Sequence, residues 1–131
     1  MTYLIDTNIL SEAFRKVPAP AVVSWLATVS EVAISAITLH EILFGLTAKP
    51  RPITLRAIDA YLGEYCRVLD VSSNIARHAG VLRGDLARRG RIRDQADMLI
   101  VATASAYGLT LATRNMRDFE GCGVALHNPF S

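Results

Sequence analysis

Residues 95–112 read QADMLIVATASAYGLTLA, an alanine-rich apolar run followed by one glycine and a short second run. The first run, 95–107, has the length and composition of a buried helix, and Gly108 is a typical helix stop. The second run, 109–112, predicts a strand because it is short and apolar. A helix that leads through a glycine into a strand is the building unit of an α/β sheet.

The same alternation continues outward along the whole chain. We expect strands at 3–5, 32–34, 68–69, 109–112 and 124–126, and helices at 18–29, 37–46, 53–65, 72–89 and 95–107. Strands separated by helices need crossover connections, so the predicted fold class is α/β, with a central, mainly parallel sheet flanked by helices on both faces. No Gly- or Ser-rich linker divides the chain, which predicts a single domain over residues 1–131.

Composition excludes several classes of protein. The chain has 131 residues, 51% of them apolar and 20% charged, which is unlike a disordered protein, and no period recurs as in a repeat protein. The N-terminus lacks a basic region and reaches Asp6 early, unlike a secretion signal, and the longest apolar run, 98–107, is half a membrane span. Two isolated cysteines fit a reducing compartment. We therefore expect a cytoplasmic protein without a membrane segment.

Four acidic residues interrupt hydrophobic segments, where acids are uncommon: Asp6, Glu41, Asp97 and Asp118. Taken singly, each has an ordinary structural explanation as a strand end, the polar side of a helix, a helix-dipole contact or a cap. Taken together, Asp6 and Asp118 lie near the ends of strands and Asp97 at the start of a helix, and ligands bind at the carboxyl ends of the strands in such sheets. Converging carboxylates would repel one another, and a hard divalent cation such as Mg²⁺ would relieve that repulsion.

Four segments resemble, in order, the motifs of PIN-domain ribonucleases, specifically the toxins of VapBC-type toxin–antitoxin pairs. They are residues 6–12 (DTNILSE), 35–42 (SAITLHEI), 96–104 (ADMLIVATA) and 111–119 (LATRNMRDF). The ending Asn128-Pro129-Phe130 is similar to the tail of the FitB-like branch. The resemblance covers the whole chain and implies a single PIN-like domain.

The resemblance implies an acidic site that binds Mg²⁺ or Mn²⁺ through Asp6, Glu41 and Asp97. Asp118 would complete the catalytic set, because this chain has Asn115 where other members have Asp and places an Asp three residues later. Both Asn115 and Asp118 stay candidates for the fourth position.

The implied reaction is hydrolysis of RNA phosphodiester bonds, leaving a 3′ hydroxyl and a 5′ phosphate. Thr7 and Asn8 would form a secondary part of the site, with Thr7 contacting it and Asn8 fixing the loop. The family further implies a cognate VapB-like antitoxin that occludes the site. The apolar excess of so small a chain leaves room for exposed patches, and we expect a homodimer.

Arginine dominates the basic residues, with twelve Arg and only two Lys. Arg91, Arg93 and Arg114 lie close in sequence to the acidic motifs, which predicts a phosphate-binding track for RNA. The competing interpretation is a solvated helix end whose cations suit the helix dipole. Without the four site acids, eight acidic side chains face 14 basic ones, so an acidic pocket would lie in a basic surface.

Two other classes of function stay open. A catalytically silent PIN-like RNA-binding or interaction module would keep the fold without turnover. A receiver-like phosphoacceptor domain is also small, α/β and acidic, but it needs paired acids after the first strand and a lysine after a late strand. Here Asp6 is single and both Lys16 and Lys49 lie in the first half of the chain, which disfavours the receiver.

Overall fold

A parallel five-stranded sheet forms the centre of the protein in the computed structural model, which describes residues 1–131. The strands are β1 (Tyr3–Ile5), β2 (Val32–Ser35), β3 (Cys66–Leu69), β4 (Thr110–Ala112) and β5 (Leu126–His127). Their order is β3-β2-β1-β4-β5, and every neighbouring pair is parallel. The predicted α/β class and parallel sheet are therefore confirmed.

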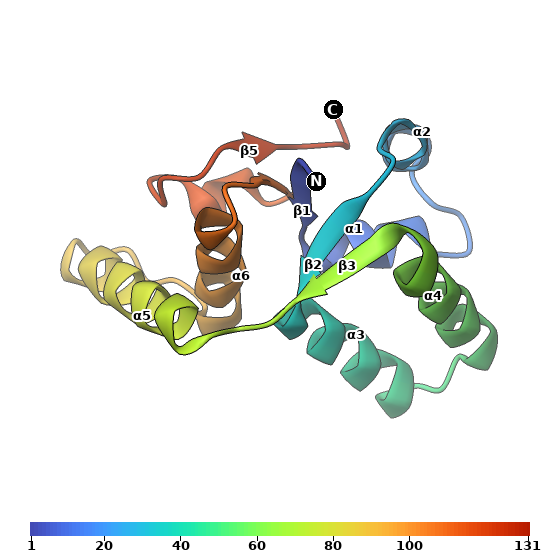
Figure 1. Cartoon of the computed structure of the whole chain (residues 1–131), viewed down its shortest axis with the longest axis horizontal. Helices are drawn as coiled ribbons and strands as arrows, with labels where there is room; N and C mark the ends of the chain where they lie inside the picture. Colours follow the sequence, from blue (N-terminus) through green and yellow to red (C-terminus); the bar gives the residue numbers. More distant parts are fainter.

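Helices cover both faces of the sheet (Figure 1). One face carries α1 (Thr7–Ala13), α2 (Pro20–Thr28), α3 (Ala36–Ala48) and α4 (Pro52–Tyr65). The other carries α5 (Ser73–Arg88) and α6 (Gln95–Ala106), with the short 3₁₀ helix η1 (Met116–Phe119) beside them. No helix combines the length and the apolar character that a bilayer crossing requires.

Strand side chains alternate between two hydrophobic clusters, one on each face. Leu4 and Leu111 pack with α5 and α6, whereas the next residues, Ile5 and Ala112, pack with α1 to α4. This is the two-residue period of a strand buried on both sides. The central strands are thus fixed from both faces, and so are the polar residues that directly follow them.

The structure differs from the prediction in one helix that was missed and in several boundaries. Helix α1 was not expected; it begins directly after Asp6, whose side chain caps it. Helix α2 begins at Pro20 instead of residue 18, because Ala19 precedes a proline and takes an extended conformation. The last strand lies at Leu126–His127 instead of 124–126, since pairing with β4, in the register Leu111 with Leu126, sets its limits.

The carboxyl ends of the central strands lead directly into helices or a turn. Asp6 follows β1 and caps α1, and Ser35 ends β2 and caps α3 by accepting the Ile37 N–H. Thr113 follows β4, which is bonded to β1 through the Asp6 N–H and the Ala112 carbonyl at 2.9 Å. One edge of the sheet therefore gathers strand ends and helix starts, the usual place for a ligand.

Candidate active site

Asp6 is the most buried acid of the site, with 4% of its surface exposed. Its Oδ1 accepts the Thr7 N–H at 2.8 Å, and its Oδ2 accepts bonds from Asn8 Nδ2 at 3.2 Å and Thr113 Oγ1 at 2.8 Å. Burial nevertheless raises the pKa of Asp6 above its ordinary value, and the Glu41 charge adds to the rise. Three donors therefore orient this carboxylate without neutralising it.

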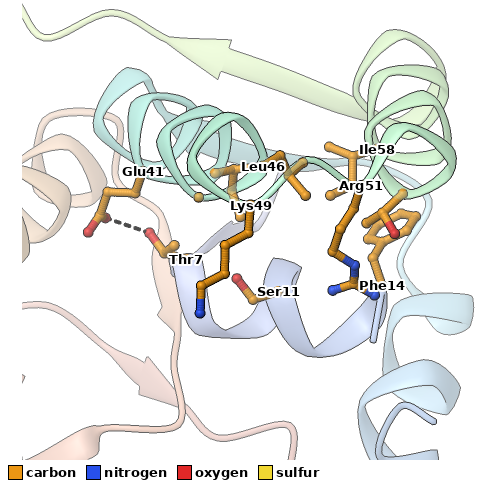
Figure 2. Close-up of a pocket in the computed structure, with 11 residues that line it drawn as sticks. Thr7, Ser11, Phe14, Glu41, Leu46, Lys49, Arg51 and Ile58 are labelled. Atoms are coloured by element: carbon orange, nitrogen blue, oxygen red, sulfur yellow. Dashed lines mark hydrogen bonds between the residues drawn. The ribbon is translucent and has the colours of Figure 1, made fainter. Parts of the chain in front are cut away.

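Glu41 projects from α3 toward the start of α1. The Thr7 hydroxyl donates to Glu41 Oε1 at 2.8 Å, drawn as a dashed line in Figure 2, and lies 3.1 Å from the Thr38 hydroxyl. Thr7 thus links Asp6, through its backbone, with Glu41, through its side chain. The expected contact of Thr7 with the site is present in the structure.

Asp97 lies in the first turn of α6, and Asp94 caps that helix by accepting the Asp97 N–H at 3.2 Å. The pKa of Asp97 is raised to about 7, first by burial and then by the charges of Asp6, Asp94, Asp118 and Glu41. The structure therefore brings acids from four separate segments of the chain close enough to repel one another.

No basic side chain compensates this group of acids. The two ion pairs in the chain, Arg15 with Glu12 and Arg88 with Asp85, both lie outside it. An uncompensated set of partly buried carboxylates is unfavourable unless a cation is added.

The fourth motif divides its roles between two residues. Asn115 precedes η1 and is exposed; its N–H donates to Thr113 Oγ1 at 3.1 Å, and its carbonyl accepts the Asp118 N–H at 3.1 Å. Asp118 is half-buried and its charge acts on Asp97. Asn115 therefore shapes the turn through its backbone, and Asp118 contributes the negative charge.

Thr113 was not singled out from the sequence, although it lies within the fourth motif. It is fully buried, donates to Asp6 and accepts from Asn115, so it joins the first and fourth motifs. Recognising it requires the strand order, since it matters only because β4 lies beside β1. Thr38 was missed for the same reason, because its partner Thr7 lies 31 residues away in the chain. Asp94 was also missed, although its cap of the Asp97 N–H is local and an Asp three residues before Asp97 is a typical helix-start signal.

The three predicted RNA-binding arginines lie in different surroundings. Arg91 Nη2 donates to the Glu120 carbonyl at 2.9 Å, and Arg93 Nη2 donates to the Arg117 carbonyl at 3.3 Å. Arg114 is exposed, with its guanidinium 4.5 Å from the centre of the Phe130 ring. Arg91 and Arg93 thus tie the loop before α6 to η1, and Arg114 is the more accessible of the three.

A cavity of about 250 Å³ opens beside Glu41, between α1, α3 and α4. Figure 2 shows Glu41 and Thr7 at one end, Arg51 and Phe14 at the other, and Lys49 between them. Its lining is Thr7, Ser11, Phe14, Glu41, Ile42, Gly45, Leu46, Lys49, Arg51, Thr54 and Ile58. We refer to it as the α1–α3–α4 pocket. It is continuous with the acidic site because they share Thr7 and Glu41.

The acids suit a hard divalent cation in donor type and charge, since all of them offer carboxylate oxygens. With the side chains as they lie, no three acidic, histidine or cysteine side chains surround one point closely enough to hold an ion. The fit is therefore one of chemistry and electrostatics: four carboxylates around Asp97, with no protein cation among them.

Comparisons with known proteins agree on one protein family. Residues 3–121 match the model of the PIN domain. The chain is 33% identical to "VapC ribonuclease Y4jK" of Sinorhizobium fredii, over 97% of this chain and 96% of that one. It is 32% identical to "Toxin FitB" of Neisseria gonorrhoeae, over 97% of both. The structure of VapBC2 from Rickettsia felis bound to a promoter DNA fragment superposes with a TM-score of 0.86 at 29% identity, over 98% of each chain.

Proposed function

The chain belongs to the PIN-domain family, and on that premise we propose that it is a metal-dependent endoribonuclease toxin held inactive by a cognate VapB-like antitoxin. Relatives over nearly the whole length carry the names ribonuclease and toxin. A solved structure similar to this chain is a VapBC complex. One acid from each of the four motifs supports the proposal, because the charges of Asp6, Glu41 and Asp118 act together on Asp97.

The observation that carries the proposal is the convergence of Asp6, Glu41, Asp97 and Asp118, from four separate segments, with no ion pair to a basic side chain; together with burial, the neighbouring carboxylates raise the pKa of Asp97 to about 7. A fold that gathers these charges without a basic partner has an electrostatic cost that a bound cation would offset. A structural explanation for each acid alone does not account for their convergence.

We propose that Asp6, Glu41 and Asp97 hold Mg²⁺ or Mn²⁺. Such an ion, when bound, polarises a phosphate oxygen and makes a bound water a stronger nucleophile. The chain's own residues orient the donors: Thr113 and Asn8 fix Asp6 Oδ2, and Thr7 fixes Glu41. Asp118 adds negative charge beside Asp97.

RNA hydrolysis tests the proposal. Purified protein should cleave RNA with Mg²⁺ or Mn²⁺, and EDTA or Asp6→Asn should lower the rate at least about 100-fold, because metal activation supplies several kcal/mol of the barrier. Cleavage that survives EDTA or Asp6→Asn would contradict the proposal and indicate a contaminant. RNA binding without turnover would favour the catalytically silent module.

Homodimer formation is a second, separate proposal. On α3, Phe44 is 70% exposed and Leu43 39% exposed, and both line a shallow hollow with His40 and Thr47. Large apolar side chains gathered on one helix face favour association. Sedimentation showing only monomer at high concentration would contradict the dimer. Location in the cytoplasm stays a prediction.

A further inference from the structure

We propose that the α1–α3–α4 pocket binds a single-stranded segment of the RNA next to the scissile phosphate, with Lys49 and Arg51 on its phosphates. The inference rests on the proposed function, because the pocket begins at the acidic site. It assigns the substrate's path to one side of that site, along α3 and toward α4 (Figure 2).

The direction of the path follows from helix geometry. Glu41 and Gly45 lie four residues apart on one face of α3, and Lys49, four residues further on, is the C-cap of that helix, its N–H donating to the Gly45 carbonyl; all three line the pocket. At 1.5 Å per residue, Lys49 lies about 12 Å along the axis from Glu41. This length corresponds to roughly two to four nucleotides, given ~3.4 Å or more per phosphate in a nucleic-acid strand.

The charges along this path are ordered. Glu41 lies at the catalytic end, where a cation would bridge to phosphate, whereas Lys49 and Arg51 lie further out and are exposed. Neither takes part in either of the chain's two ion pairs. An unpaired lysine and arginine beside a cavity complement the phosphate backbone, which supplies most of the affinity of nucleic-acid binding.

The walls between these charges suit a nucleobase. Phe14 and Ile58 line the Arg51 end, and the Phe14 ring is held edge-on against Tyr61 at 5.6 Å between centroids. Proteins bind single strands by combining a cationic groove with aromatic or arginine surfaces on which bases stack. The pocket combines both elements.

A substitution at Gly45 can block the pocket while leaving its charged residues unchanged. A Cβ built on Gly45 meets no atom within 4 Å, and the residue lies inside α3. A leucine there should therefore fill the pocket and leave the fold intact, because leucine is a better helix former than glycine. Gly63 in α4 is equally open and lies outside the pocket, so Gly63→Leu is the matched control.

The test measures binding separately from cleavage. A fluorescein-labelled 12-nucleotide single-stranded RNA of mixed sequence is titrated with the full chain in EDTA, and anisotropy is read at several salt concentrations. Lys49→Ala with Arg51→Ala should weaken binding about 10-fold or more and lower the salt slope by about 1.4, at ~0.7 per phosphate contact on a single strand. Gly45→Leu should weaken binding by a similar factor.

Lys16→Ala and Arg56→Ala are the charge controls, because both residues are exposed and outside the pocket. These two variants and Gly63→Leu should bind RNA within about two-fold of the wild-type affinity. The charge-conserving double variant Lys49→Arg with Arg51→Lys should bind RNA more tightly than the double alanine variant, because both positive charges are kept. Thermal unfolding of every variant checks that the fold is kept.

Pocket variants that bind RNA like their controls would overturn the inference. If those variants instead lost affinity for a protein partner, the pocket would be a protein-docking site. Cleavage of the same RNA by the wild-type protein with Mg²⁺ is measured in parallel. Its absence would reject the proposed function, whereas the binding comparison would still decide the assignment of the pocket.

Discussion

Two pairs of basic residues flank the acidic site, and their side chains are used differently. Arg91 and Arg93, in the loop before α6, donate to the backbone carbonyls of Glu120 and Arg117. Lys49 and Arg51, in the loop between α3 and α4, are exposed beside a cavity and join neither ion pair. Both pairs have the composition of a phosphate-binding patch when only the sequence is considered.

The difference shows that a basic cluster near an active site is available to a ligand only if its donors are free. A guanidinium that donates to carbonyls of its own chain has to break those bonds before it binds phosphate. We therefore interpret Arg91 and Arg93 first as residues that hold η1, and with it Asp118, against α6. Their predicted contact with RNA stays untested, and the following variants probe the contrast with Lys49 and Arg51.

Removal of both loop arginines should have the largest effect on stability. Arg91→Ala with Arg93→Ala loses two bonds from charged donors to carbonyls, and we expect a fall of about 2–4 kcal/mol in the free energy of unfolding. Arg91 should account for most of it, because Arg93 Nε is buried without a partner and its removal relieves a cost. Urea unfolding measures the change.

The matched control is Arg77→Ala with Arg89→Ala, since both residues are exposed and neither forms an ion pair. It should stay within about 0.5 kcal/mol of wild type. Equal effects of the two double variants would remove the distinction between tied and free arginines.

The comparison also requires that neither basic pair neutralises Asp97. A carboxyl whose pKa is raised in the folded state, here to about 7 from 3.8, destabilises the fold once it ionises. Stability in EDTA should thus be full below about pH 4, fall as the pH rises to about 7 and then level off. Asp97→Asn should raise the free energy of unfolding at pH 8 by about 1–2 kcal/mol, which is less than the full pKa shift corresponds to because solvent screens part of the charge. At pH 4 the substitution should change the free energy of unfolding little.

Melting temperatures at the two pH values measure this dependence. A gain from Asp97→Asn that is the same at pH 4 and pH 8 would show that the charge of Asp97 is already compensated. One of the basic pairs would then be the first candidate for that compensation.

Substitutions at two glycines after η1 separate the effect of crowding against Arg91 from the effect of backbone strain. Gly121 and Gly123 have φ of 79° and 76°, so alanine is strained at either position by ~1 kcal/mol. Only at Gly121 would a Cβ also come within 3.1 Å of Arg91 Nη1. Gly121→Ala should therefore destabilise the protein by about 0.5–1 kcal/mol more than Gly123→Ala in chemical denaturation. Equal values would mean that Arg91 moves freely there.

The smallest effect on stability is expected from the basic pair in the loop between α3 and α4. Lys49→Ala with Arg51→Ala should change the free energy of unfolding by less than about 0.5 kcal/mol, because neither side chain is paired. A clear loss of stability in the same denaturation series would indicate that these residues hold α3 and α4 together. They would then no longer contrast with Arg91 and Arg93.

Much of the fold follows from the sequence because strands buried on both faces leave uninterrupted apolar runs. The run before Asp6 is such a strand, and the helix from residue 95 leaves an apolar run in the same way because its residues 98–104 are buried or half-buried. Helix α1 was missed because it has only seven residues and depends on the Asp6 cap and on packing of Ile9 and Leu10. Short helices are weak without tertiary contacts, so local pattern does not reveal them.

The four acids that the structure brings together could be singled out from the sequence, but the groups that orient them could not. An acid inside an apolar segment stands out in the sequence, as Glu41 does in α3. The partners of Arg91 and Arg93 are backbone carbonyls more than twenty residues away, and carbonyls carry no sequence signal. The pocket beside Glu41 also needed the structure, because its lining combines α1, α3 and α4.

The bond between Thr113 and Asp6 joins residues 107 positions apart in the chain. During synthesis Asp6 leaves the ribosome more than a hundred residues before β4 and Thr113. A nascent or prematurely ended chain therefore lacks the strand beside β1 and the donor that orients Asp6. The order of translation delays assembly of the site until β4 and Thr113 have been made, so products that end before Thr113 should carry no activity.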